Sequence, residues 1–336
     1  MFGIGASGAF ATRHPGNPRR GFRRNRSRKE KDMKPRRSIL SVPGHVEKMH
    51  LKAGQSGADV VMLDLEDSVP ADQKEAARSQ VVRSLETMDW SGKVVTVRIN
   101  SLDTPFAYRD LVTVLETAVD RVDSVVVPKV NAPGDIHFVD RMMDGIEMAR
   151  GMSRRVGIEA SIETARGMDA VSEIAAASRR LVSLVFGIAD YSASIGARLV
   201  SISGHGEKEE EIYPGHRWHF ALSRMILAAK AHGLMAIDAP YGNFKDPQGL
   251  ERSAVMACAI GCDGKWAIHP DQIEIVNRVF TPSRADIDLA LKVLNAIGDA
   301  GAQGRGAVAV EGRMVDQATL RLARQLVDQA RYLKLL

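Results

Sequence analysis

Charged side chains follow several short apolar segments of this chain, directly where each segment ends. The residues concerned are Asp64, Glu66, Asp67, Arg98, Glu163 and Asp190. Taken alone, any one of them would more often be a solvated loop residue or a helix cap than part of a site. Their coincidence at the ends of successive segments favours one shared functional site.

Two of these carboxylates suit a hard metal ion. Glu163 and Asp190 offer oxygen ligands from neighbouring segments, and magnesium typically takes one or two protein carboxylates and leaves its other positions to water and substrate. The thiolate and HExxH patterns that are typical of zinc sites do not occur in the sequence. The sequence therefore predicts a magnesium site that is open to a chelating oxyacid, with manganese as the alternative metal.

Arg98 suits an electrophilic role beside such a metal. A guanidinium keeps its proton at any working pH, so it can hold the negative charge that develops on a carbonyl oxygen. A P-loop and a G-x-S-x-G nucleophile motif are both absent from the sequence. We therefore expect a site that stabilises an enolate.

Repeated strand and helix patterns are expected to position these residues. Eight short β-branched runs alternate with longer helical patterns such as 73–87 and 133–150, which is typical of βα units around a parallel sheet. The expected strands are 38–42, 59–65, 94–100, 124–127, 156–162, 181–186, 234–237 and 264–268. Since no long polar linker divides the series, we expect a (β/α)8 TIM barrel, whose active site forms at the carboxyl ends of the strands.

The pattern changes to helices only after Phe280. Helices are expected at 283–301 and 316–333, joined by a glycine-rich hinge at Gly301, Gly304 and Gly306. The sequence thus predicts three parts: a disordered basic N-terminal extension (1–35), a barrel catalytic domain (36–280) and a C-terminal helical lid (281–336).

Charge is distributed unevenly along the chain. Residues 1–37 hold 12 basic and 2 acidic residues, whereas the remainder holds 34 basic and 39 acidic residues. The body therefore gives no sign of a nucleic-acid partner. For the extension three interpretations stay open: an upstream start with Met33 as the working start, which we favour, an organellar transit peptide, or a basic arm for polyanions.

Two further features bear on the compartment. No run of about 18 apolar residues occurs, so no membrane span is expected. Cys258 and Cys262 lie four apart on one expected helix, where buried or partly buried core thiols are favoured over a metal pair. We expect a reducing, cytoplasmic location, with organellar import through the extension as the alternative.

Several short motifs occur in a fixed order from about Arg37 to the C-terminal helix. They are Val42-Pro43-Gly44, Leu63-Asp64-Leu65-Glu66-Asp67, Val97-Arg98-Ile99-Asn100, Leu102-Asp103-Thr104-Pro105, Val127-Pro128-Lys129, Ile162-Glu163-Thr164-Ala165, Gly187-Ile188-Ala189-Asp190-Tyr191, Gly264-Lys265-Trp266-Ala267-Ile268-His269-Pro270 and Gly312-Arg313-Met314-Val315-Asp316. In this order they resemble the malyl-CoA/β-methylmalyl-CoA lyases of the citrate lyase beta-subunit-like group, within the HpcH/HpaI aldolase superfamily.

The resemblance implies a role for each site residue. Glu163 and Asp190 would bind magnesium, Arg98 would bind substrate and Asp316 would be the catalytic acid/base. Glu66 and Asp67, with Asp64 beside them, would lie behind the metal ligands and orient metal-bound water. The implied contacts to substrate or coenzyme A, which is part of the substrate, are Arg98, Ser41, Lys52, Ala189, Ile268 and His269.

The resemblance also implies the reaction and the assembly. The expected reaction is reversible Claisen-type cleavage of (S)-malyl-CoA or β-methylmalyl-CoA to glyoxylate and acetyl-CoA or propionyl-CoA. A malyl-CoA thioesterase or a citramalyl-CoA lyase on the same scaffold is the alternative, and a non-catalytic protein that binds nucleic acid through its tail is disfavoured. A homotrimer or homohexamer is expected, with Asp316 serving a neighbouring subunit's barrel, although Asp316 as a simple helix cap stays open.

Overall fold

The computed structural model describes residues 35–198, 205–206, 217–302 and 307–336. The expected basic extension lies outside these residues except for its last position. The same holds for most of the segment 199–216, which follows α7 (Ile188–Ser194).

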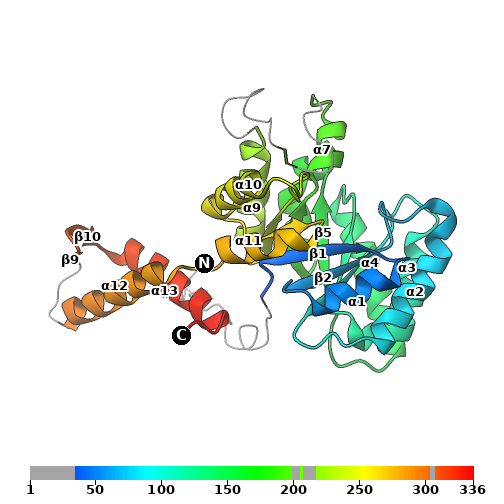
Figure 1. Ribbon diagram of the computed structural model, residues 1–336, viewed down its shortest axis with the longest axis horizontal. Coiled ribbons are helices and arrows are strands. Elements are labelled where there is room, and N and C mark those ends of the chain that lie inside the picture. Colours follow the sequence, from blue (N-terminus) through cyan, green and yellow to red (C-terminus); the bar gives the residue numbers. More distant parts are fainter. Residues whose placement is uncertain (1–34, 199–204, 207–216, 303–306) are drawn as a thin grey trace, which may run out of the picture. The chain divides into compact units, whose positions relative to one another are not determined.

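Eight parallel strands close into a barrel in which each strand pairs with its neighbours in the chain and β8 pairs with β1 (Figure 1). The strands are β1 (Ser38–Pro43), β2 (Val60–Asp64), β3 (Val94–Arg98), β4 (Ser124–Val127), β5 (Gly157–Ile162), β6 (Leu181–Phe186), β7 (Met235–Asp238) and β8 (Gly264–Ala267). Each expected strand overlaps an observed one, with ends that differ by at most two residues. The TIM-barrel prediction is confirmed.

Helices between the strands cover the outside of the barrel. They are α1 (Glu47–Gln55), α2 (Lys74–Thr87), α3 (Ala107–Ala118), α4 (Pro133–Ala149), α5 (Ala165–Asp169), α6 (Val171–Ala176), α7, α9 (His219–Ala231), α10 (Pro247–Ile260) and α11 (Ile273–Val279), with short 3-10 turns at Ala71–Gln73, Val119–Arg121 and Pro270–Gln272. The expected helices 73–87 and 133–150 correspond to α2 and α4. On α2, Ala77, Val81 and Leu85 recur every four residues and are fully buried.

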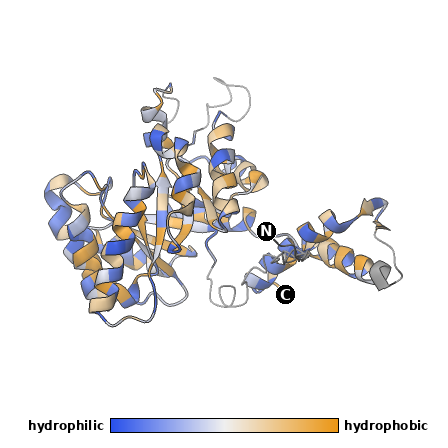
Figure 2. Cartoon of the chain, turned by 180° about the vertical axis from the view of Figure 1, so that it is seen from behind, coloured by the Kyte–Doolittle hydropathy of each residue, from blue (hydrophilic) through white to orange (hydrophobic). Residues whose placement is uncertain are grey.

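The strands are apolar on both faces because both faces are buried. In β2, Val60 and Met62 belong to a cluster inside the barrel, whereas Val61 and Leu63 pack against the helices. Figure 2 shows the barrel strands coloured largely as hydrophobic, while the surrounding helices carry both kinds of residue. A parallel strand buried in this way reads as an unbroken apolar run, and so polar residues stand out where the strand ends.

A buried ion pair lies at the amino-terminal end of β5, inside the barrel. Glu159 is 1% exposed and its Oε1 atom accepts hydrogen bonds from Arg36 (2.6 Å) and Ser124 (2.6 Å), while Oε2 accepts one from Ser183 (2.8 Å). Burial alone would raise the pKa of Glu159, but the Arg36 charge and these hydrogen bonds lower it. This network lies at the opposite end of β5 from Glu163 and is structural.

The region after Phe280 is not helical throughout, so that prediction was wrong. Helix α12 (Arg284–Ala302) and helix α13 (Gln317–Tyr332) are separated by an antiparallel hairpin of β9 (Val308–Val310) and β10 (Arg313–Val315). Glu311 and Gly312 both have positive φ, at 49° and 76°, as a two-residue hairpin turn requires. The hinge residues Gly304 and Gly306 lie outside the described residues. A helical C-terminal region is thus present, and its action as a lid stays a prediction.

Two observations concern the cysteines and membranes. Helix α10 ends at Gly261, whose φ of 111° stops the helix, so Cys262 lies beyond the helix that holds Cys258 and the expectation of one shared helix was wrong. Both thiols are free, Cys258 partly and Cys262 fully buried, as expected of core thiols. Among the residues described, no helix is long and apolar enough to span a membrane. The cytoplasmic location stays a prediction.

Candidate active site

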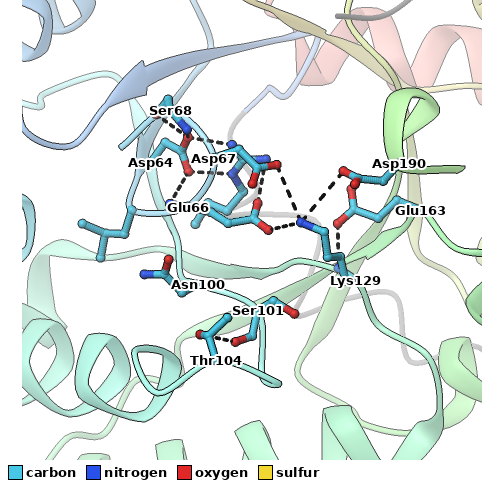
Figure 3. Close-up of polar contacts among 12 residues, drawn as sticks. Asp64, Glu66, Asp67, Ser68, Asn100, Ser101, Thr104, Lys129, Glu163 and Asp190 are labelled. Carbon is cyan, nitrogen blue, oxygen red and sulfur yellow. Dashed lines mark hydrogen bonds and ion pairs between the residues drawn. The ribbon is translucent and has the colours of Figure 1, made fainter. Parts of the chain in front are cut away.

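The charged residues that follow the strands meet at the carboxyl ends of β2 to β6. Asp64 and Arg98 are the last residues of β2 and β3 and pair in register, Glu163 follows β5, and Asp190 lies in the first turn of α7 after β6. Figure 3 shows the side chains of Glu66 and Asp67 facing those of Glu163 and Asp190, with Lys129 between the two pairs. The barrel therefore brings the expected residues to one mouth.

Arg98 is fixed from two sides. Its Nε and one terminal nitrogen each donate to an Asp64 oxygen at 2.6 Å, and its other terminal nitrogen lies 3.1 Å from Glu66 Oε2. The guanidinium also lies over the Trp266 ring, 5.6 Å from the ring centre. Burial works against the charge, but Asp64 and Glu66 raise the pKa of Arg98, and Arg98 in turn lowers the pKa of the buried Asp64. Both groups are therefore ionised.

Lys129 is a site residue to which sequence reasoning assigned no role. Its amine donates to Glu66 Oε1 at 2.6 Å and lies 3.7 Å from Asp67 and 3.9 Å from Asp190, while its backbone N–H donates to Glu163 Oε1 at 2.6 Å. The signal was present, since Lys129 follows β4 in the same way as the other charged residues follow their strands.

Glu163 is held in a tight, buried place. It is 3% exposed, and a Cβ atom on Gly187 would lie 2.1 Å from its Oε2 atom, so only glycine leaves room for the carboxylate. Burial and the nearby charges of Glu66 and Asp190 raise the pKa of Glu163 to about 7. The carboxylate is thus placed where a further positive charge would stabilise its ionised form.

The residues present fit a magnesium ion. Within the described ranges, no group of three or more His, Cys, Asp or Glu side chains could hold a metal. A magnesium ion would therefore take Glu163 and Asp190 as its protein ligands and complete its coordination with water and substrate. The Asp190 side chain is 41% exposed, which leaves it accessible from solvent. Two carboxylates with open positions around them match the donor set of magnesium better than that of zinc.

The other acidic residues have distinct surroundings. Asp64 contacts Arg98, whereas the buried Glu66 lies between Arg98 and Lys129, and Asp67 has a side chain that is 61% exposed. Burial, with the charge of Asp67, raises the pKa of Glu66 in spite of both cations. Orientation of metal-bound water by these residues stays a prediction.

The expected coenzyme A contacts lie on several elements. Ser41 is in β1, Lys52 is exposed on α1 and Ala189 is exposed on α7, whereas Ile268 and His269 follow β8. The backbone N–H groups of Ile268 and His269 donate to Gln272 Oε1 at 2.8 and 3.3 Å. The Phe244 ring stacks on the His269 ring with centres 4.6 Å apart. Their part in substrate binding stays a prediction.

Asp316 caps α13 in this structure. Its exposed carboxylate accepts hydrogen bonds from the backbone N–H groups of Ala318 (2.8 Å) and Thr319 (3.1 Å), and these bonds lower its pKa. Across the described part of the chain, no hydrogen bond or ion pair joins Asp316 to Arg98, Glu163 or Asp190. The structure therefore shows the cap and leaves a catalytic role as a prediction.

Comparison with known proteins decides the family. Residues 37–270 match the model of the family described as HpcH/HpaI aldolase/citrate lyase. The chain belongs to this family. The resemblance inferred from the ordered motifs is thereby confirmed. An L-malyl-CoA/beta-methylmalyl-CoA lyase of Rhodobacter capsulatus is 41% identical over 89% of this chain and 95% of the relative. The similarity therefore extends beyond the barrel.

Two further members of the family bear on the chemistry. A (3S)-malyl-CoA thioesterase of Cereibacter sphaeroides is 34% identical over 88% of this chain and 95% of its own length. The structure of CitE from Mycobacterium tuberculosis, in complex with magnesium, acetoacetate and coenzyme A, matches with a TM-score of 0.70 and 32% identity over 88% of this chain and 98% of that chain. One solved relative of this chain therefore holds magnesium and coenzyme A together.

Proposed function

We propose that this HpcH/HpaI family member is a magnesium-dependent carbon-carbon lyase that cleaves (S)-malyl-CoA or β-methylmalyl-CoA to glyoxylate and acetyl-CoA or propionyl-CoA. The observation that carries the proposal is the carboxylate pair of Glu163 and Asp190 (Figure 3), with the cation Arg98 near enough to act on Glu163, in a chain 41% identical to such a lyase. Manganese is proposed as a substitute metal.

Each residue has a proposed part in the reaction. A magnesium ion held by Glu163 and Asp190 would supply Lewis acidity and a template for the oxyacid. Arg98, kept in place by Asp64 and Glu66, holds negative charge on a substrate oxygen as the enolate develops. In the condensing direction Asp316 removes a proton from the methyl group of acetyl-CoA, and the resulting carbon attacks the aldehyde of glyoxylate.

Binding of the large substrate requires contacts outside the metal pair. We propose that Lys52 and the loop of Ile268 and His269 contact coenzyme A, with Ser41 and Ala189 lining the path to the metal. A homotrimer or homohexamer is proposed. In such an assembly the exposed Asp316 of one subunit would complete the active site in the barrel of a neighbouring subunit. Residues 281–336 would act as the lid on the barrel domain 36–280.

Product analysis tests the proposed function. The purified full chain is incubated with magnesium and malyl-CoA, β-methylmalyl-CoA or citramalyl-CoA, and glyoxylate, pyruvate, malate and free coenzyme A are measured. The lyase releases glyoxylate together with an acyl-CoA. If pyruvate from citramalyl-CoA is the main product, citramalyl-CoA is the substrate instead. If turnover persists in excess chelator, the reaction does not require a metal ion.

A thioesterase is the second candidate, favoured by the 34% identical relative from Cereibacter sphaeroides. It would use the same metal pair and Arg98, with water as the attacking group. Malate and free coenzyme A, formed without glyoxylate, would identify this activity. The single incubation with malyl-CoA therefore distinguishes the two candidates.

The planar fork of Arg98 predicts that a lysine cannot replace it. Arg98→Lys keeps the charge but loses the two parallel bonds to Asp64, so we expect kcat to fall about 100-fold while KM changes little. Steady-state kinetics with malyl-CoA measures both constants. Wild-type kcat in a folded Arg98→Lys protein would mean that Arg98 has only a structural role.

A further inference from the structure

The amine of Lys129 occupies the centre of the acidic mouth. It lies 2.6 Å from Glu66 Oε1, 3.7 Å from Asp67 and 3.9 Å from Asp190. Figure 3 shows it between Glu66 and Asp67 on one side and Glu163 and Asp190 on the other. Lys129 therefore links Glu66, one of the two carboxylates that hold Arg98, to the carboxylates proposed to hold magnesium.

The backbone at Lys129 fixes this position. Its φ is 49°, in the left-handed region that residues other than glycine seldom adopt. Such a conformation persists where the surroundings enforce it, and here the backbone N–H is aimed at Glu163 Oε1 at 2.6 Å. The turn after β4 thus points the N–H at one metal ligand and the side chain at Glu66. A substitution that changes only the side chain, such as methionine for Lys129, leaves the backbone N–H that donates to Glu163 in place.

The charge of the amine has two opposite effects. Glu66 is 4% exposed and its Oε1 atom accepts a hydrogen bond from the Lys129 amine. Loss of the amine would therefore leave this buried carboxylate with Arg98 as its remaining cationic partner. The same positive charge lies within 4 Å of Asp190 and therefore repels a divalent cation at the neighbouring pair. A lysine amine is ordinarily protonated at neutral pH, and its three neighbours here are carboxylates, so it carries a positive charge.

We propose that Lys129 is a positioning residue that holds Glu66 against Arg98 and, through its fixed charge, keeps the affinity of the Glu163–Asp190 pair for magnesium low. The inference rests on the proposed metal site and adds a determinant of its affinity. It makes an unusual prediction, because removal of the amine strengthens metal binding and weakens catalysis in the same protein. A residue needed only for folding would weaken both.

The test uses Lys129→Met in the full chain, which removes the charge and keeps the backbone N–H. Binding of magnesium alone is measured by titration calorimetry, and turnover is measured at saturating magnesium. We expect the dissociation constant for magnesium to fall about tenfold, because a like charge near the ion is lost, and kcat to fall about tenfold or more. Lys129→Arg, which retains the charge, should keep the wild-type magnesium affinity within about threefold.

Lys230→Met is the matched control. Lys230 forms an ion pair with Asp263 and lies outside the mouth, so its loss should change neither metal affinity nor kcat. Lys129→Gln is a second charge-removing variant, and thermal unfolding verifies that each protein is folded. Unchanged or weaker magnesium binding in the folded Met or Gln variant would overturn the inference. If the wild-type chain itself binds no magnesium, the proposed metal site fails first.

Discussion

Glu163→Gln should abolish magnesium binding and turnover while the barrel stays folded. Glutamine has the size of glutamate and still accepts the Lys129 N–H bond, but it brings no charge to the metal. Because one of only two proposed protein ligands is lost, we expect kcat/KM to fall by about 1,000-fold or more. Calorimetry with magnesium and turnover of malyl-CoA measure the two losses separately.

The stability of this variant gives an independent check. The pKa of Glu163 is raised to about 7 by burial and by Glu66, above its usual value of 4.5, so its ionised form opposes folding above the ordinary pKa. At about pH 8, metal-free Glu163→Gln should therefore unfold at the same temperature as the wild type or higher. A lower unfolding temperature would mean that the ionised carboxylate is needed for the fold.

Glu159→Gln is the matched control, because Glu159 lies on β5, the strand that Glu163 directly follows. Its carboxylate has a lowered pKa and is paired with Arg36, so the same substitution should destabilise the barrel and leave magnesium affinity unchanged. Glu163→Gln should thus lose metal binding without loss of stability, whereas Glu159→Gln should lose stability without loss of metal binding. Loss of magnesium binding in both would contradict the assignment of Glu163 as a metal ligand.

Asp316→Asn should lose turnover although it retains the helix cap. Asparagine caps helices about as well as aspartate, so the bonds to Ala318 and Thr319 can be kept while the proton acceptor is lost. If Asp316 is the acid/base, kcat falls by about 100-fold to 10,000-fold. If Asp316 is a cap only, the variant keeps wild-type kcat, and thermal unfolding confirms that α13 is intact in either case.

Mixed oligomers then show which barrel Asp316 serves. In a shared site, the barrel of an Asp316→Asn subunit can be completed by Asp316 from a Glu163→Gln neighbour, so random mixing of equal amounts should restore about one quarter of the sites. Co-expression with two different affinity tags selects the mixed assemblies. Mixed assemblies without activity would show that Asp316 acts in its own barrel or has no catalytic part.

Local patterns in the sequence were sufficient for most of the barrel. The eight strands are β-branched runs that are largely buried on both faces, and this burial leaves a mainly apolar signal of the expected length. The hairpin of β9 and β10 was missed because each strand has only three residues, too few for a periodic signal. Its turn signal, Glu311 followed by Gly312, lies between the two helices expected from the sequence.

The candidate site, like the fold, was predictable from the sequence only in part. By itself the sequence determined the chemical inventory, namely Glu163, Asp190 and Arg98 at strand ends, because a barrel collects strand ends at one mouth whatever the details of packing. Only the tertiary structure decided which of these side chains form ion pairs. The register of β2 and β3 places Asp64 against Arg98. The barrel brings Lys129 to Glu66, which lies 63 residues away in the sequence. The physical reason is that sequence patterns report local burial, whereas an ion pair depends on the distance between residues remote in the chain.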